Sequence, residues 1–427
     1  MPDPETHKES VEHVATYRRD LQYYKFCLYG FLKNLRFFEP FIILFFLEKG
    51  FAYLQIGALY AIREVATNVL EIPTGVIADA MGRRRTMIYA FLAYIAAFIV
   101  FYFSASFAIC ALSMVLFSFG EAFRTGTHKA MILEYLRLNG WQDQKVHYYG
   151  HTRAWSQLGS ALSSVIAASI VFISGRLSVV FLYTVLPSVL GLALMVSYPR
   201  ELEGRVRRFN RTWIWGNFGK VLREFVVAFR NPKLLRAISN VSVYGGFYKA
   251  LKDYLQPVLN SLALALPILL ALQDRQRTAV VIGAVYFVLY VLTSYAARYS
   301  GKAAERFRSL RVPLNLTLAL GLGLGVAAGL LYHAQLLIAA AMCYIGIYLV
   351  QNLRRPMGVA IVSDMLKEDI LATALSAESQ LKTLVAAMVA PLVGFLADRL
   401  GVGQALIITC CLLLVILPGC LIRRGTP

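Results

Sequence analysis

Apolar runs of about twenty residues recur along almost the whole chain and are separated by short polar stretches. Folded as a helix, a run of that length crosses a hydrocarbon core of about 30 Å. The pattern predicts helices over 24–47, 53–80, 86–104, 108–136, 147–173, 177–198, from about 235, and over 278–297, 312–332, 335–366, 372–396 and 403–422. We therefore expect an all-α integral membrane protein with twelve transmembrane helices.

The longest polar interruption divides these helices into two groups of six. The division predicts a polar N-terminal segment, a first bundle, a basic linker, a second bundle and a short tail over 1–22, 23–198, 199–234, 235–422 and 423–427. Within the linker, apolar residues recur on one helical face between 218 and 229, which predicts an interfacial helix. The short apolar stretch 262–272 is expected to extend the seventh helix or to lie at the membrane surface.

An internal sequence repeat supports the same division. Four residues of the fourth helix reappear in the tenth at a constant shift: Arg124, Ala130, Glu134 and Leu136 correspond to Arg354, Ala360, Asp364 and Leu366. The segment 154–158 of the fifth helix likewise resembles 377–381 of the eleventh. Two matches in the right order favour a duplication and two pseudo-symmetric six-helix bundles.

Composition and charge limit the class of protein. With 58% hydrophobic and 16% charged residues, the chain is too apolar for a soluble protein of 427 residues. Its net charge of +19 gathers in alternate loops, which predicts membrane orientation with both termini in the cytoplasm and no nucleic-acid partner. The six cysteines lack metal-ligand spacing, so we expect neither a metal nor another cofactor.

One polar turn between two apolar runs carries a motif, formed by Gly75, Asp79, Gly82, Arg83, Arg84 and Arg85. Gly75 leaves space for a neighbouring helix, and Gly82 suits the left-handed residue that ends a helix. Because a carboxylate in the last turn of a helix opposes the macrodipole, Asp79 needs an arginine or the N-terminus of another helix as its partner. The alternative is an ordinary basic turn after a buried helix.

The order G-x-x-x-D-x-x-G-R-R-R resembles the loop signature between helices two and three of the major facilitator superfamily. The resemblance implies a bacterial-type twelve-helix transporter of the cytoplasmic (inner) membrane, in which helices one, four, seven and ten line a central cavity. A second segment, 394–401, looks like this signature but lies between the last two helices. We expect it to be a helix-end turn without a gating role. The symmetric copy in the family belongs near 300–306, where this chain has a degraded version.

Ionisable residues lie inside several predicted spans. Each would cost about 2.5–3.5 kcal/mol facing lipid at the midplane, so we expect them to line a wet interior. The candidates for substrate binding are Arg36, Arg124, Tyr248, Lys252, Gln351, Arg354 and Arg355, because unmatched arginines in a low-dielectric cavity favour an anionic group. The candidates for proton coupling are Glu39, Glu121 and Glu378. Local ion pairs, such as Glu121 with Arg124, are the structural alternative.

These features predict a secondary active transporter that moves a small anionic or zwitterionic solute by alternating access. We expect proton coupling and a monomer in the lipid bilayer. The first alternative is proton-driven efflux of amphipathic drugs, although this interior looks too cationic for that substrate class. A transporter-like receptor without flux is the second alternative. An enzyme is not expected, because the short basic loops contain neither acidic or histidine clusters nor a phosphate-binding loop.

Overall fold

The structure is a computed structural model that describes residues 19–142, 145–203, 232–267, 270–307, 309–364 and 368–423. Within these ranges, the side chains at 72–80, 145–147, 149–150, 153, 301–305, 363–364 and 368–376 are not described. The predicted interfacial helix of the linker and most of the N-terminal segment lie outside the described residues. The described chain is helical and contains no strand.

The first half contains α1 (Leu21–Leu32), η1 (Glu39–Phe41), α2 (Ile42–Glu48), α3 (Tyr53–Met81), α4 (Arg83–Phe103), α5 (Phe107–Arg124), α6 (Thr127–Leu138), α7 (Lys145–Ser174), α8 (Val179–Val196) and η3 (Arg200–Glu203). The second half contains α10 (Pro232–Leu251), η4 (Lys252–Tyr254), α11 (Leu255–Ala265), α12 (Asp274–Glu305), α13 (Arg311–His333), α14 (Leu337–Asp364), α15 (Glu368–Leu400) and α16 (Val402–Cys420). Because α11 continues the seventh pass to Ala265, the prediction that 262–272 extends this helix is confirmed for its first part.

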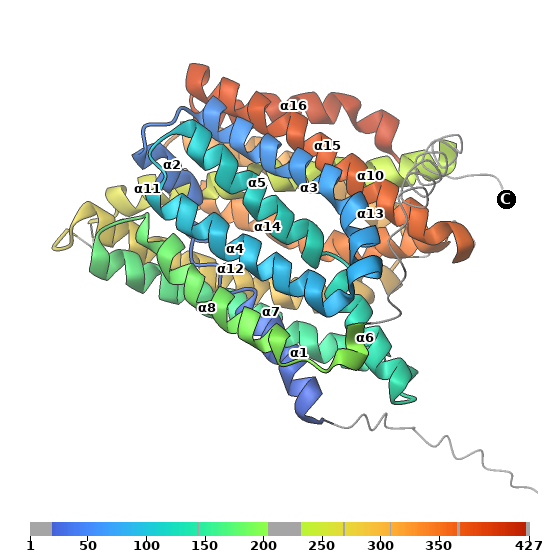
Figure 1. The fold of residues 1–427 in the computed structure, drawn as a ribbon. Helices are drawn as coiled ribbons and strands as arrows, with labels where there is room; N and C mark the ends of the chain where they lie inside the picture. The colour runs from blue at the N-terminus through green and yellow to red at the C-terminus, as the bar shows by residue number, and fades with distance from the viewer. Residues whose placement is uncertain are drawn as a thin grey trace, which may run out of the picture.

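The helices run back and forth as two bundles that pack side by side (Figure 1). We call the end where α1 begins and α16 ends the terminal face, and the end where α3 begins and α15 ends the far face. The main contacts between the bundles are α3 with α15 and α7 with α12. Under the internal repeat these two pairs are equivalent, so the packing agrees with the predicted duplication.

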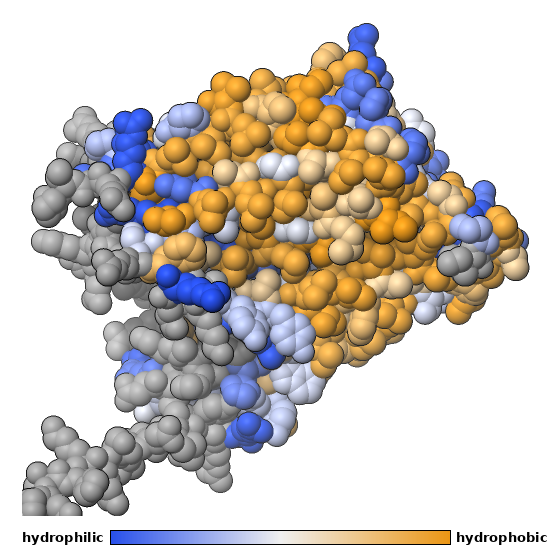
Figure 2. Space-filling view, turned by 180° about the vertical axis from the view of Figure 1, so that it is seen from behind, coloured by the Kyte–Doolittle hydropathy of each residue, from blue (hydrophilic) through white to orange (hydrophobic). Residues whose placement is uncertain are grey.

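Nine helical stretches among the described residues are long and apolar enough to cross a membrane. The other three predicted passes are α1 with α2, α3, and α10 with α11, which are interrupted or carry several charges. In Figure 2 a broad apolar surface occupies the middle of the molecule, with polar residues toward both ends. This distribution confirms the expectation of a membrane-spanning all-α protein.

Three predicted passes are interrupted where their charged residues lie. The first pass leaves helical geometry after Leu32 and resumes at η1, so Lys33 and Arg36 lie in a non-helical stretch rather than on one face of a continuous helix. The fourth pass is interrupted at Gly126, whose φ of +80° favours glycine. The seventh pass contains η4 at Lys252. The interruptions place polar side chains between the helices, as is common at transporter binding sites.

Candidate functional site

A glutamine from the second bundle supplies hydrogen-bond partners to the backbone where the first pass is interrupted. Backbone groups inside a membrane need hydrogen-bond partners, because no water is available there. The Gln256 side chain of α11 accepts from the N–H of Ile43 at 2.8 Å and donates to the carbonyl oxygen of Glu39 at 2.8 Å. Gln256 is fully buried. It therefore joins the two bundles where the first pass resumes helical geometry.

Gln256→Leu is expected to lower the free energy of unfolding by about 2 kcal/mol, because it leaves a buried N–H and a buried carbonyl without their partner. Thermal unfolding of the detergent-solubilised protein measures the effect as a lower apparent Tm. Gln273→Leu is the matched control, since Gln273 is exposed at the far face. Equal apparent Tm values for both variants would contradict this role for Gln256.

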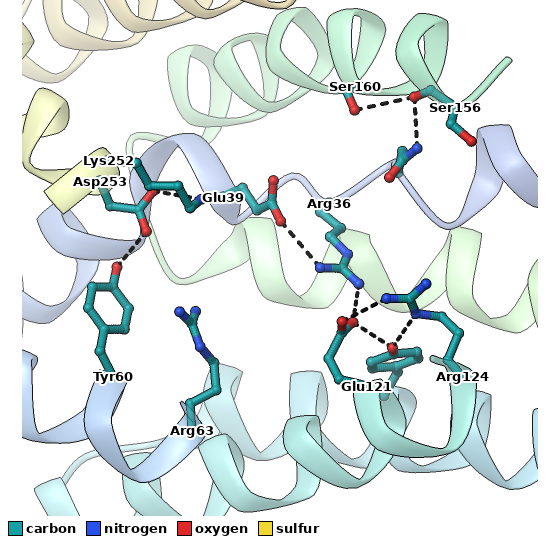
Figure 3. A network of polar contacts seen from close by, with 12 residues as sticks. Arg36, Glu39, Tyr60, Arg63, Glu121, Arg124, Ser156, Ser160, Lys252 and Asp253 are labelled. Atoms are coloured by element: carbon teal, nitrogen blue, oxygen red, sulfur yellow. Dashed lines mark hydrogen bonds and ion pairs between the residues drawn. The ribbon is translucent and has the colours of Figure 1, made fainter. Parts of the chain in front are cut away.

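A compact ion cluster lies beside this interruption (Figure 3). Glu121 of α5 binds Arg36, contacts Arg124 at 2.7 Å and accepts a hydrogen bond from the Tyr94 hydroxyl at 2.6 Å. Arg36 also pairs with Glu39 at 3.3 Å, and Arg124 donates to the Tyr94 oxygen at 2.9 Å. The cluster thus brings together four predicted site residues, and Glu121 is the anion that two arginines share.

A second group of charges connects the bundles. Tyr60 of α3 donates to the Asp253 carboxylate of η4 at 3.0 Å, and Lys252 contacts the other oxygen of that carboxylate at 3.1 Å. Figure 3 shows the Lys252 side chain directed toward Glu39. Asp253 is only 3% exposed. Because it takes partners from both bundles, Asp253 is a buried carboxylate at their interface that was not among the predicted coupling residues.

A further pair crosses the interface close by. Lys249 of α10 contacts Glu64 of α3 at 2.7 Å, and Glu64 also contacts its neighbour Arg63 at 3.1 Å. Across the central groups just described, cations and carboxylates nearly balance: Arg36, Arg63, Arg124, Lys249 and Lys252 lie with Glu39, Glu64, Glu121 and Asp253. The expectation that Arg124 is an unmatched cation is therefore wrong, because Glu121 neutralises it.

Arg354 lies in a different environment from its repeat partner Arg124. It is 3% exposed and donates to Thr317 at 2.8 Å and to the Asn240 side chain at 2.7 Å, with its guanidinium over the Tyr244 ring. The shift that relates Arg124 to Arg354 places Gln351 opposite Glu121. Since no carboxylate stands at this position, Arg354 binds neutral groups of α10 and α13 and connects the helices of the second bundle.

The remaining predicted residues occupy several places. Glu378 pairs with Lys382 one turn along α15 at 3.4 Å, outside the Glu121 cluster. The Tyr248 ring meets the Tyr348 ring edge-on at 5.1 Å. Gln351 is half-buried on α14. The structure therefore brings Arg36, Glu39, Glu121, Arg124 and Lys252 into one region and places Glu378 outside that group.

A polar cavity of about 240 Å³ lies between the bundles, in the half of the molecule nearer the terminal face. Its lining includes Lys33, Asn34, Ser156, Gln157, Ser160 and Arg355. Lys33 comes from the first bundle and Arg355 from the second, and the described lining contains no carboxylate. Asn34 is held in place by donating to the carbonyl oxygens of Ser156 at 2.8 Å and Gly30 at 3.1 Å. The cavity therefore offers two cations among neutral hydrogen-bonding groups.

Most of this lining was not among the predicted site residues. His128 also forms part of the wall, where it stacks on Tyr29 at 3.5 Å and contacts the Tyr198 hydroxyl at 3.2 Å. A signal was nevertheless present in α7, where Thr152, Ser156 and Ser160 recur every four residues and so share one helical face. Arg355 is the predicted residue that does line the cavity.

The arginines of the basic motif bind other helices of the first bundle at the terminal face. Gly82, between α3 and α4, has a φ of +93° and a ψ of 141°, so the positive φ expected of a glycine is present although the conformation is not the left-handed helical one. Arg84 donates to the carbonyl oxygens of Met195 at 3.3 Å and Val196 at 2.6 Å, at the C-terminal end of α8. Arg83 donates to the Ala130 carbonyl at 3.3 Å, and Arg85 lies 3.9 Å from Glu203. Gly75 and Asp79 lie in the part of α3 whose side chains are not described.

Comparisons with known proteins give a consistent family. The sequence model of the family described as Major Facilitator Superfamily matches residues 28–379 of this chain. A curated relative, the "Uncharacterized MFS-type transporter YxaM" of Bacillus subtilis (strain 168), is 33% identical over 90 residues. That alignment spans 21% of this chain and 23% of the relative, so it covers less than a quarter of either protein.

Solved transporters share the fold. A mutant of the nucleoside transporter NupG matches with a TM-score of 0.76 at 13% identity, covering 93% of this chain and 98% of the other. A POT family transporter in complex with a thioalcohol-conjugated peptide matches with a TM-score of 0.72 at 13% identity, covering 93% and 94%. At this identity the likeness concerns the fold.

Proposed function

The chain belongs to the Major Facilitator Superfamily and is a transporter rather than an enzyme, and on that premise we propose that it moves a small anionic or zwitterionic solute by alternating access. The observation that carries the substrate class is the cavity between the bundles, with Lys33 and Arg355 in its wall and no carboxylate in the described lining. A cavity with two cations and neutral hydrogen-bonding groups complements a negatively charged group.

The position of these cations suits a transport site. Lys33 follows the interruption of the first pass, whereas Arg355 lies on α14 of the second bundle. An anion between them would contact both bundles at once. Its binding would then change the relative free energies of the inward-open and outward-open states. A transported solute must have such an effect in alternating access.

We propose that the terminal face is cytoplasmic and that the protein acts as a monomer in the bacterial inner membrane. Basic residues are frequent at this face, among them Arg83, Arg84 and Arg85 in the turn between α3 and α4. Cytoplasmic loops carry such an excess of lysine and arginine. On this assignment the structure is closed toward the outside and holds its polar cavity in the cytoplasmic half.

Proton coupling is assigned to the Glu121 cluster. Glu121 shares two arginines with Glu39 and Tyr94, so protonation of Glu121 would release Arg36 and Arg124 from their shared anion. The freed arginines would favour a different arrangement of the helices around them. Glu378 is the secondary candidate, because its partner Lys382 lies on the same helix and does not connect the bundles.

Efflux of amphipathic drugs is the alternative within the same class. A site for cationic drugs needs an apolar wall with an acidic group. The described cavity wall instead combines Lys33 and Arg355 with the polar residues Asn34, Ser156 and Ser160. The cavity therefore favours the anionic substrate class. A receptor without flux is distinguished from a transporter by uptake into proteoliposomes.

A thermal-shift screen tests the substrate class. Anionic metabolites that raise the apparent Tm of the wild-type protein are expected to bind Lys33→Gln and Arg355→Gln at least about tenfold more weakly, because hydrogen bonds to charged groups contribute about 1.5–3 kcal/mol. Lys25→Gln is the control, since Lys25 donates to the Ser197 carbonyl at the terminal face. Stabilisation by cationic drugs alone, or unchanged anion binding in both variants, would refute the proposal.

A further inference from the structure

At the far face a carboxylate of the second bundle binds the first bundle. Asp398, in the last turn of α15, accepts hydrogen bonds from the backbone N–H groups of Tyr53 and Leu54, each at 2.8 Å. Tyr53 and Leu54 are the first two residues of α3. The carboxylate of the second bundle therefore caps a helix of the first bundle.

The helix ends explain why this contact is favourable. The first N–H groups of a helix have no partner within it, and the N-terminus carries a partial positive charge. A carboxylate in the last turn of its own helix opposes the dipole of that helix. For Asp398 the N-terminus of α3 therefore supplies both two donors and a favourable field, which α15 itself does not.

The backbones of the same two helices are in direct contact at this point. A Cβ added at Gly394 of α15 would lie 2.2 Å from the carbonyl oxygen of Tyr53, and one added at Gly57 of α3 would lie 2.3 Å from the carbonyl oxygen of Ala390. The Tyr53 ring also stacks on Tyr254 of the second bundle at 5.8 Å. The two helices therefore lie close enough for a short side chain to cap one from the other.

An ion pair also connects the two bundles at the same face. Arg275 near the start of α12 contacts Glu48 at the end of α2 at 2.9 Å, and both side chains are partly exposed. Asp398 is exposed as well, so water and salt screen both contacts. The Asp398 contact differs from the ion pair in that it binds two backbone N–H groups and depends directly on the approach of α3 to α15.

We propose that Asp398 is a gating residue of the transport cycle, whose carboxylate favours the state in which the far face is closed. When α3 and α15 separate, Asp398 loses two charge-assisted hydrogen bonds, and water replaces them. The segment 394–401 therefore acts as a gate, although its sequence suggested only a helix-end turn. The proposal rests on the transporter fold and does not depend on which solute is carried.

Distances between spin labels test the gate without any substrate. One label pair reports the far face, at Ala105→Cys and Ala334→Cys, and a second reports the terminal face, at Asn139→Cys and Ser309→Cys. Cys343 and Cys411, which are not fully buried, are replaced by serine in this background. Both pairs are measured on the full-length protein in lipid nanodiscs, because the two faces must move in opposite directions during rocking.

Asp398→Ala is expected to raise the ratio of far-face-open to far-face-closed protein about tenfold, the size of effect seen when a helix N-cap is removed. The far-face distance should lengthen and the terminal-face distance should shorten together. Asp398→Asn, which keeps one acceptor oxygen without the charge, should give a smaller shift in the same direction and carries the test if the alanine variant does not fold.

The matched control is Asp274→Ala. Asp274 is an exposed carboxylate at the far face, and its ion pair is with Arg277 on its own helix. It should leave both distances unchanged. The proposal is overturned if Asp398→Ala and Asp398→Asn keep the wild-type distances, if Asp274→Ala shifts them equally, or if the far face lengthens without a change at the terminal face.

Discussion

Glu121→Gln is expected to abolish proton-driven uptake and to lower the free energy of unfolding by about 3 kcal/mol, because it removes the anion shared by two largely buried arginines. The side chains of Arg36, Glu121 and Arg124 are each between 18% and 19% exposed. Water therefore screens them only in part. Removing one partner of such a pair leaves the other charges without compensation, which is more costly than removing the whole pair.

A second substitution separates the structural role of Glu121 from its role in coupling. In Glu121→Gln/Arg124→Gln one cation is removed together with the anion, so the apparent Tm should recover toward that of the wild type. Uptake driven by a pH gradient should stay absent, because position 121 no longer carries a titratable group. Recovery of proton-driven uptake in the double variant would assign the coupling proton to another residue.

The measurements are thermal unfolding in detergent and uptake into proteoliposomes of an anion that stabilises the wild-type protein. Asp274→Asn is the control, because an exposed ion pair contributes at most about 1 kcal/mol. Its side chain is 78% exposed. The control should retain both the apparent Tm and the uptake of the wild type.

The membrane passes could be predicted from sequence, but their interruptions could not. Apolar runs long enough to cross a bilayer are a strong signal, and they identified the helical passes. The interruption near Arg36 lies within an apolar run, and its local signal is Pro40. Since proline and glycine are also tolerated inside continuous membrane helices, Pro40 and Gly126 did not by themselves predict where helical geometry ends.

Sequence could also find the buried charges without assigning their partners. Glu121 and Arg124 are three residues apart, so their ion pair was a predictable alternative. The contact of Glu121 with Arg36 joins residues 85 positions apart and depends on how two helices pack. Arg354 shows the opposite case, since the repeat correctly relates it to Arg124, whereas the exchange of Glu121 for Gln351 changes its environment.

The proposed role of the segment 394–401 could not be predicted from the sequence of that segment, because its binding partner lies elsewhere in the chain. A carboxylate at the end of a helix can cap any helix N-terminus that lies close enough, and here the capped residues are more than 340 positions away. The family resemblance pointed to the other end of the molecule, where the motif between α3 and α4 lies. Only the packing of α3 against α15 identified the contact.

Gly394→Val is expected to prevent closure of the far face and so to reduce uptake to the background level. The added Cβ would lie 2.2 Å from the Tyr53 carbonyl oxygen, which belongs to the backbone of the other bundle and has no side chain to move aside. To restore an ordinary contact distance the helices must separate by about 1 Å, which would also break the Asp398 hydrogen bonds.

Gly323→Val is the control for this substitution. Gly323 also lies within a helix, but nothing is within 4 Å of the position that its Cβ would take. Because Gly394 contacts the other bundle, Gly394→Val should keep the fold of each bundle while the spin-label distance across the far face lengthens. Such a variant would show that closure of this face is a step of transport. Wild-type uptake and wild-type distances in Gly394→Val would mean that the close approach of α3 to α15 is not required for transport.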